Sequence, residues 1–305
     1  PDMRQLTRKQ IRYILDLARC TVLAEIRNEF QIAFLLSESS FFITRNRIIL
    51  KTCGKTTLLK TLKPLTEFAY ELGFTKYVLY YSRRSYLFPE LQPPSQREFS
   101  NELKIIQPFC DNGAGYTFGR LNRDCWNFYC GQSAQGMTDE PPGQTVEVIM
   151  RDLNPKKMRF FYACNVASAK EATDLSGISK LFPKSRLSAY LFEPCGYSVN
   201  GLMDKDEYFT VHVTPEPEFS YASFETNIAL PCYLQLVKRV LEMFEPQTFI
   251  CTLVTEICSP TYAAHNSLEL ADALPLYVRN ELHTALTACG RKLTFAEFSR
   301  EDMSE

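Results

Sequence analysis

The sequence predicts an α+β protein in which antiparallel β-sheets are covered by helices. First, 45% of the 305 residues are hydrophobic and 13% are aromatic, so the chain can bury a large core. Second, segments with strand character outnumber segments with helical spacing. Third, the strands follow one another in consecutive runs, whereas a doubly wound parallel sheet would alternate strands and helices.

Apolar alternation and runs of β-branched or aromatic residues identify the expected strands. They span residues 31–36, 41–52, 76–82, 115–120, 125–130, 145–151, 186–192, 208–214, 220–225, 248–256 and 292–298. Helical spacing, introduced in several places by Thr, Asn or Pro, identifies the expected helices. They span residues 7–19, 54–72, 154–163, 168–180, 232–244 and 267–287. The Pro-rich segments 89–95 and 138–143 are expected to be surface loops and not linkers, so we expect one domain over residues 1–305.

The charge balance argues against nucleic acid and anionic membranes as partners. The 34 basic and 35 acidic residues give a net charge of -1, which provides no broad positive field. No segment reaches the roughly 20 apolar residues that span a bilayer. The N-terminal PDMRQLTRKQ also lacks the apolar core of a secretory signal, so we expect a cytosolic location.

The 11 cysteines predict reduced thiols and no metal site. Their number is odd, they contain no C-x-x-C pair, and only three histidines could join them as ligands. We expect most of them to be buried as small apolar residues.

Two glycine-rich segments fail as nucleotide-binding loops. The run GKTT at 54–57 would need a glycine at position 49, where the sequence has Ile49. The run GAG at 113–115 is followed by Gly119, one residue too far for a dinucleotide loop. Hydrolase and metalloprotease motifs such as G-x-S-x-G and H-E-x-x-H are absent from the sequence.

The segment AFLLSESSFF, residues 33–42, places a polar cluster between two apolar runs. By itself it predicts the tip of a hairpin, because serines are common at turns. It is also the first of five blocks in chain order: LSESS (36–40), KTCG (51–54), FEPCGYS (192–198), HVTPE (212–216) and FSYASFET (219–226). With these blocks the chain resembles the eukaryotic-type S-adenosylmethionine decarboxylases as far as about residue 255. The resemblance implies a four-layer αββα sandwich of two antiparallel sheets flanked by helices, and a homodimer.

The resemblance also implies a self-made cofactor. In the family, the serine that matches Ser39 attacks the carbonyl of the preceding residue, here Glu38, and converts the amide into an ester. β-Elimination then leaves a pyruvoyl group on an α chain of residues 39–305 and frees a β chain of residues 1–38. The amine of S-adenosylmethionine forms a Schiff base with this ketone, which acts as the electron sink for decarboxylation. The product is the aminopropyl donor for spermidine and spermine.

Three further residues match the family's catalytic groups. His212 matches the base that removes the serine α-proton, and Ser198 matches the hydroxyl that stabilises the tetrahedral intermediate. Cys53 matches the acid that protonates the substrate carbon; an ordinary thiol pKa of about 8.5 keeps it protonated. Outside these blocks, His212 would be interpreted as a hydrogen-bonded strand residue and Cys53, like Cys195, as a core cysteine.

Substrate-binding residues follow from the same blocks. Glu216 matches the carboxylate that accepts from both ribose hydroxyls, and Phe192 matches one of two rings that stack on the adenine. Leu36 matches the residue whose backbone contacts the base edge.

The resemblance also implies a regulatory pocket for putrescine. Thr145, Glu147 and Glu225 match its residues, although they could equally be strand residues that face solvent. Gly143 replaces an aspartate of the activated members, and Arg291 could supply a positive charge instead, so we expect weak or absent stimulation.

The family begins with a strand of the pattern FEGxEKxLE, and this sequence starts after it. We leave open whether that strand is truncated or truly missing. The alternative function is that of a noncatalytic regulatory paralogue that activates a catalytic homologue. Because such paralogues typically lose the cleavage serine, the presence of Ser39 with Cys53, Ser198 and His212 favours an enzyme.

Overall fold

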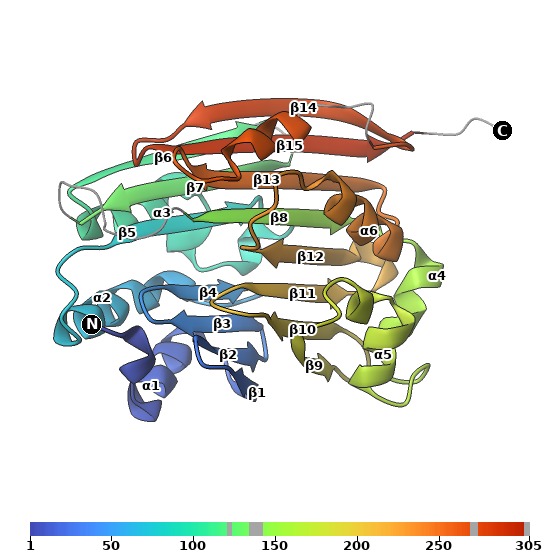
Figure 1. Ribbon diagram of the computed structural model, residues 1–305, viewed down its shortest axis with the longest axis horizontal. Helices are drawn as coiled ribbons and strands as arrows, with labels where there is room; N and C mark the ends of the chain where they lie inside the picture. Colours follow the sequence, from blue (N-terminus) through green and yellow to red (C-terminus); the bar gives the residue numbers. More distant parts are fainter. Residues whose placement is uncertain (121–123, 134–142, 269–273, 302–305) are drawn as a thin grey trace. The chain divides into compact units, whose positions relative to one another are not determined.

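The computed structural model describes residues 1–120, 124–133, 143–268 and 274–301. The chain forms two compact units (Figure 1). Unit 1 comprises Pro1–Leu23, Phe30–Pro141 and Leu286–Arg291. Unit 2 comprises Ala24–Glu29, Pro142–Ala285 and Lys292–Glu305. Among the helices in the described ranges, none is long and apolar enough to span a bilayer.

Unit 1 carries the polar hairpin on a four-stranded sheet. Its strands, in order across the sheet, are β1 (Val22–Arg27), which continues into unit 2, β2 (Gln31–Leu36), β3 (Ser39–Thr44) and β4 (Ile48–Thr52). Helix α1 (Arg8–Ala18) begins at a capping box in which Thr7 and Gln10 bond each other's backbone N–H groups. The apolar face of α1 packs on Phe34 and Phe41, so this helix and the hairpin strands share one core.

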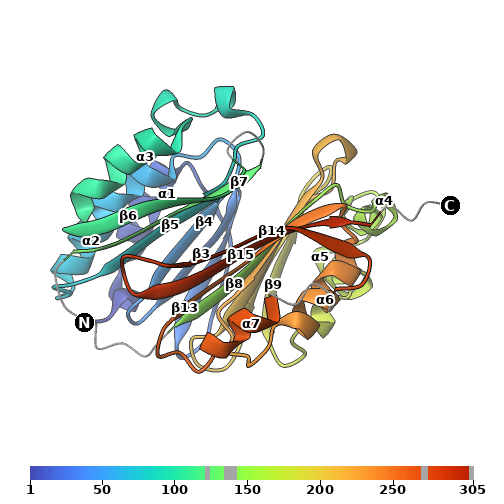
Figure 2. The ribbon, with the colours of Figure 1, turned by 90° about the horizontal axis from the view of Figure 1, so that it is seen from above.

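A three-stranded antiparallel sheet completes unit 1. Its order is β5 (Val78–Arg84), β7 (Cys125–Gln132) and β6 (Asn112–Gly119). Two more helices belong to this unit, α2 (Leu62–Glu71) and α3 (Phe99–Ile106). Ile106 and Tyr129 are fully buried in a common core, and Figure 2 shows α1, α2 and α3 along one side of the unit 1 strands.

Unit 2 is built on an eight-stranded sheet. The order across it is β14 (Tyr277–Leu286), β15 (Arg291–Arg300), β13 (Thr248–Glu256), β8 (Gln144–Arg151), β12 (Tyr221–Thr226), β11 (Tyr208–Thr214), β10 (Tyr197–Leu202) and β9 (Arg186–Leu191). From β13 to β9 all neighbours are antiparallel. Among the described residues of this unit, four segments are α-helical: α4 (Pro155–Met158), α5 (Ala169–Leu175), α6 (Leu234–Phe244) and α7 (His265–Leu268).

The two faces of the eight-stranded sheet differ in chemistry because side chains alternate along each strand. On one face, Val148, Val211 and Phe224 pack with α4, α5 and α6 in a large apolar core. The opposite face carries buried polar residues, namely Glu147, Ser198, Asn200, Thr210, His212 and Ser223. Burial of polar groups costs free energy unless they are hydrogen-bonded. A face with many buried polar side chains is therefore a candidate for a functional site.

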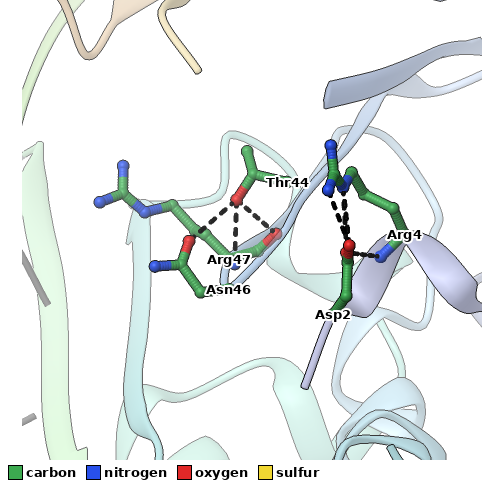
Figure 3. Close-up of polar contacts among 5 residues, drawn as sticks. All are labelled: Asp2, Arg4, Thr44, Asn46 and Arg47. Atoms are coloured by element: carbon green, nitrogen blue, oxygen red, sulfur yellow. Dashed lines mark hydrogen bonds and ion pairs between the residues drawn. The ribbon is translucent and has the colours of Figure 1, made fainter. Parts of the chain in front are cut away.

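The α+β class and the antiparallel pairing are confirmed. The expected four-layer αββα stacking depends on how the two units are placed relative to each other, and it stays a prediction. The prediction of a single strand over residues 41–52 is wrong, because the chain turns after Thr44 and forms two strands, β3 and β4. Thr44 Oγ1 accepts from the backbone N–H of Arg47 at 3.0 Å and donates to Asn46 Oδ1 at 3.3 Å, which separates β3 from β4 (Figure 3).

The helix expected at 267–287 is also wrong. Helix α7 ends at Leu268, and Tyr277–Leu286 is the edge strand β14. Half of its residues, namely Arg279, Glu281, Leu282, Ala285 and Leu286, are good helix formers, but pairing with β15 decides its conformation. The elements missed from the sequence are β1, β10 and α3. Of the expected loop at 138–143, all but Gly143 lies outside the described residues.

Candidate active site

The polar hairpin of unit 1 has its tip at Ser37 and Glu38. The β2–β3 register pairs Leu36 with Ser39, which leaves only those two residues in the turn. Ser39 and Ser40 instead lie in β3 and are buried. Ser39 has a φ of 139°, a conformation that residues with a side chain rarely adopt. Backbone strain of this kind is concentrated at functional sites.

The carbonyl before Ser39 is held by a neighbouring strand. The backbone N–H of Cys53 donates to Glu38 O at 3.0 Å, just beyond the register pair of Ser39 with Thr52. On the other side of the tip, Ser37 N–H donates to Thr21 O at 2.9 Å. A donor on this carbonyl stabilises negative charge that develops on its oxygen, as in an oxyanion hole.

The side chain of Cys53 lies beside the same turn. Desolvation, and secondly the negative charge of Glu38, raise the pKa of Cys53 to about 12. The raised pKa keeps the Cys53 thiol protonated at neutral pH, although the residue as a whole is exposed. Burial also raises the pKa of Glu38. Gly54 has a φ of 64°, and a Cβ there would lie 3.0 Å from Glu38 Oε2, so glycine leaves room for this carboxyl group.

In unit 2, Ser198 and His212 are register partners on β10 and β11. Ser198 Oγ lies 2.8 Å from His212 Nδ1. The other ring nitrogen, Nε2, lies 2.9 Å from Thr210 Oγ1, which in turn is 3.0 Å from Asn200 Oδ1. All four side chains are buried, so these contacts replace water as hydrogen-bond partners.

The contacts of Thr210 select a tautomer of His212. Thr210 Oγ1 donates to Asn200 Oδ1 at 3.0 Å and to Val199 O at 3.1 Å, two oxygens that cannot donate, so we assign its single hydrogen to them. Thr210 therefore accepts from Nε2–H, and Nδ1 is the unprotonated nitrogen that accepts from Ser198. Thr210 and Asn200 were not selected from the sequence. The available signal is their spacing of two residues from His212 and Ser198, which puts each pair on one face of its strand.

The FEPCGYS and HVTPE blocks meet beside β9 and β11. The ring of Phe192 packs edge-on against Tyr190, with 4.8 Å between centroids, and Phe192 N–H donates to Gly196 O at 2.9 Å. Desolvation, then the charge of Glu216 and its hydrogen bond with the thiol, raise the pKa of Cys195 to about 11. Cys195 is half-buried, so the prediction that it lies in the core is wrong.

The expectation of mostly buried cysteines is wrong in general. All eleven are free thiols, but only Cys20, Cys130 and Cys251 are buried, and four, including Cys53, are exposed.

The acidic residues Glu147 and Glu225 face each other as register partners on β8 and β12. Thr145 lies two residues before Glu147, on the same face of β8. Tyr208 Oη donates to Glu225 Oε1 at 2.6 Å, and Glu147 is 8% exposed, so the solvent-facing alternative does not hold for Glu147. The guanidinium of Arg291 lies 4.4 Å from the centre of the Tyr80 ring.

The structure thus forms three groups from the predicted residues. Within unit 1 it brings together Leu36, Glu38, Ser39 and Cys53; within unit 2 it pairs Ser198 with His212 and Glu147 with Glu225.

Comparisons with known proteins agree with the family resemblance of the sequence. The profile of the family described as adenosylmethionine decarboxylase matches residues 1–299. Two similar proteins are named S-adenosylmethionine decarboxylase proenzyme. The Drosophila melanogaster protein is 38% identical over 281 residues, covering 88% of this chain and 81% of the relative. The Xenopus laevis protein is 38% identical over 273 residues, covering 88% and 82%.

A solved structure is similar in fold. The crystal structure of the Trypanosoma brucei AdoMetDC-delta26 monomer matches with a TM-score of 0.67 and 20% identity. The match covers 86% of this chain and 99% of that one.

Proposed function

Because this chain belongs to the adenosylmethionine decarboxylase family, we propose that it decarboxylates S-adenosylmethionine after cutting itself between Glu38 and Ser39. The product would be the aminopropyl donor for spermidine and spermine. The observation that carries the proposal is the Glu38–Ser39 peptide. It combines a strained φ at Ser39 with a backbone donor on the Glu38 carbonyl.

The first step is an acyl shift at this peptide. Ser39 Oγ attacks the carbonyl carbon of Glu38, the C–N bond breaks, and the serine proton moves to the amide nitrogen. Negative charge develops on Glu38 O, where the N–H of Cys53 already donates. The positive φ of Ser39 raises the free energy of the uncut peptide and so lowers the activation free energy of the acyl shift.

The resulting ester must lose the α-proton of Ser39. We assign this proton transfer to His212, whose Nδ1 is left unprotonated by the contact between Nε2 and Thr210. Ser198, as the donor to that nitrogen, is assigned to the preceding tetrahedral intermediate. Both assignments toward Ser39 come from the family resemblance, and the variants described below test them.

A pyruvoyl group at position 39 fits the residue present, because the serine oxygen first attacks and then leaves as part of the Glu38 carboxylate. Water then supplies the ketone oxygen, and the former amide nitrogen leaves as ammonia. When formed, this group supplies the electrophilic ketone that takes up the electrons released with CO2. Cys53 keeps its proton at neutral pH and would deliver it to the substrate carbon. Phe192 would stack on the adenine, Glu216 would accept from the ribose hydroxyls, and Leu36 would contact the base edge through its backbone.

Three further assignments rest on the resemblance and the composition. We propose a homodimer, a cytosolic location and a weak or absent response to putrescine. The rival function, a noncatalytic regulatory paralogue, would not need the strained Ser39 or its carbonyl donor.

The intact mass of the purified protein tests the proposal. Two chains divided between residues 38 and 39 are expected for the wild type, and one uncut, inactive chain for Ser39→Ala, which has no oxygen to attack with. Ser40→Ala is the matched control, because Ser40 is the adjacent buried serine of the same strand and should leave cleavage intact. Cleavage in Ser39→Ala would rule out the cofactor assignment, and an uncut wild type would support the regulatory paralogue.

A further inference from the structure

Unit 1 contains a group of three thiols, Cys110, Cys130 and Cys289, which we call the thiol cluster. Cys130 lies on β7 and is fully buried, while Cys110 and Cys289 are half-buried. A Cβ placed at Gly131 would lie 2.6 Å from Cys110 Sγ, which puts Cys110 beside β7 on the face opposite the Cys130 side chain, because side chains alternate along a strand. None of these cysteines has a role in the proposed decarboxylation.

Cys289 reaches β7 because the turn between β14 and β15 is anchored there. Its neighbour Ala288 donates its backbone N–H to Tyr116 Oη on β6 at 2.8 Å. On the other side of β7, Arg291 lies over the ring of Tyr80 on β5. Tyr80 is the register partner of Cys130, so the two anchors lie on the strands that flank Cys130.

The turn itself has a defined shape. Thr287 N–H donates to Arg291 O at 2.8 Å, and Gly290 N–H donates to Thr287 O at 2.9 Å. Gly290 has a φ of 68°, which a glycine adopts without strain. These bonds define the backbone shape of the turn that carries Cys289.

The side chains of Cys130 and Cys289 lie near enough for each to change the pKa of the other. The interaction with the Cys289 side chain, assisted by Thr287 and by the positive charge of Arg291, lowers the pKa of Cys130, although burial opposes the shift. The pair thus holds a thiolate more readily than an isolated cysteine. Burial raises the pKa of Cys110, so this third thiol stays protonated.

We propose that Cys130 and Cys289 form a reversible disulfide when the protein encounters a hydroperoxide. Cys289 is the partly exposed member, so when the hydrogen shared by the pair lies on Cys130, the Cys289 thiolate attacks the peroxide oxygen and becomes a sulfenic acid as the O–O bond breaks. The thiolate of Cys130 then attacks that sulfur, the S–S bond forms, and the hydroxyl group leaves as water. In sum, two thiols lose two electrons and two protons, and hydrogen peroxide is reduced to two molecules of water.

The crosslink would tie the turn 287–291 to β7 and close a long loop of the chain. Closing a loop of this length restricts the unfolded state, so the oxidised protein should melt at least about 4 °C higher than the reduced protein.

Mass spectrometry tests this inference without reference to catalytic activity, so it stands or falls separately from the proposed function. The full chain is reduced with dithiothreitol, freed of reductant, treated with equimolar hydrogen peroxide and capped with N-ethylmaleimide. We expect a loss of about 2 Da before capping, two fewer maleimide adducts and a linked peptide pair containing Cys130 and Cys289. Dithiothreitol should restore the starting mass.

Variants identify the partners. Cys289→Ser should abolish the linked peptides, whereas Cys232→Ser, which removes an exposed cysteine outside the thiol cluster, should not change them. A bond between Cys110 and Cys130 would overturn the proposal. Sulfinic acid at Cys289 with no linked peptide would also overturn it. The linked peptide and the sulfinic acid are both measured on the wild-type protein, so the test does not depend on whether a variant folds.

Discussion

Ser198 Oγ and His212 Nδ1 lie 2.8 Å apart across the β10–β11 pair, and Thr210 occupies the far side of the imidazole. The serine therefore meets the ring nitrogen that carries no proton, provided that Thr210 keeps its hydroxyl group. A general base needs its unprotonated nitrogen on the side of the group from which it takes a proton.

Thr210→Val removes a buried hydrogen bond worth about 1.4 kcal/mol, so that His212 can place its proton on Nδ1. Self-cleavage should then be at least about tenfold slower. Thr210→Ser keeps the hydroxyl and should cleave at nearly the wild-type rate. The measurement is the time course of chain separation on denaturing gels across pH. Equal rates for the valine and serine variants would show that the hydroxyl does not position the imidazole.

His212→Ala should stop the reaction one step later than Ser39→Ala. The acyl shift does not require the imidazole in this scheme, so an ester accumulates between Glu38 and Ser39. Hydroxylamine cleaves esters but not ordinary amides, and it should release a chain ending at residue 38. Absence of any hydroxylamine-sensitive species would give His212 another role.

Cys53→Ala should still cut itself but turn over at least about 100-fold more slowly, because it loses the proton donor. Self-cleavage survives because alanine retains the backbone N–H that bonds the Glu38 carbonyl. Misdirected protonation should also inactivate the variant during turnover. Initial rates and progress curves of the processed variant test this, with Cys232→Ala as the exposed-cysteine control. Wild-type kinetics in processed Cys53→Ala would contradict the assignment.

Putrescine should stimulate decarboxylation weakly or not at all. Glu147 and Glu225 face each other and could attract a diamine, but Gly143 lacks the carboxylate that activated members have there. The test is a putrescine titration at fixed pH and salt. A strong, saturable rise that disappears in Glu225→Gln would contradict the prediction.

His265 should make folding stability depend on pH. The residue is fully buried between Thr255 and Thr294, and burial, followed by the charge of Lys292, lowers its pKa to about 4. In the unfolded chain it titrates near 6.5, so the unfolded state binds more protons between pH 6.5 and 4. The free energy of unfolding should therefore fall by about 3 kcal/mol as pH decreases through this range.

Urea unfolding at pH 7 and pH 4 measures this effect, in the uncut Ser39→Ala background so that a single chain unfolds. His265→Gln is the matched variant, because glutamine can still bond the threonines but does not titrate. The wild-type decrease should exceed that of the variant by about 3 kcal/mol. Equal decreases would place the acid sensitivity elsewhere.

The sequence identified the hairpin, the family blocks and most strands because these signals are local. Strand alternation and the serine cluster depend only on neighbouring residues. It did not identify Thr210 and Asn200, because their importance arises from the pairing of β10 with β11, and β10 itself was missed. Helix propensity likewise failed at β14, where pairing with β15 overrides it. The exposure of Cys53 and the half-buried position of Cys195 depend on turns that composition cannot predict.

The pairing of β2 with β3 gives self-cleavage a thermodynamic consequence. Cutting at Glu38–Ser39 would leave β2 and α1 on one chain and β3 on the other, joined by the register from Gln31–Thr44 to Leu36–Ser39 and by their shared core. Refolding would then change from a unimolecular to a bimolecular reaction. Formation of the folded protomer should depend on concentration in the processed protein, whereas in the uncut Ser39→Ala chain the protomer should fold at the same rate at every dilution.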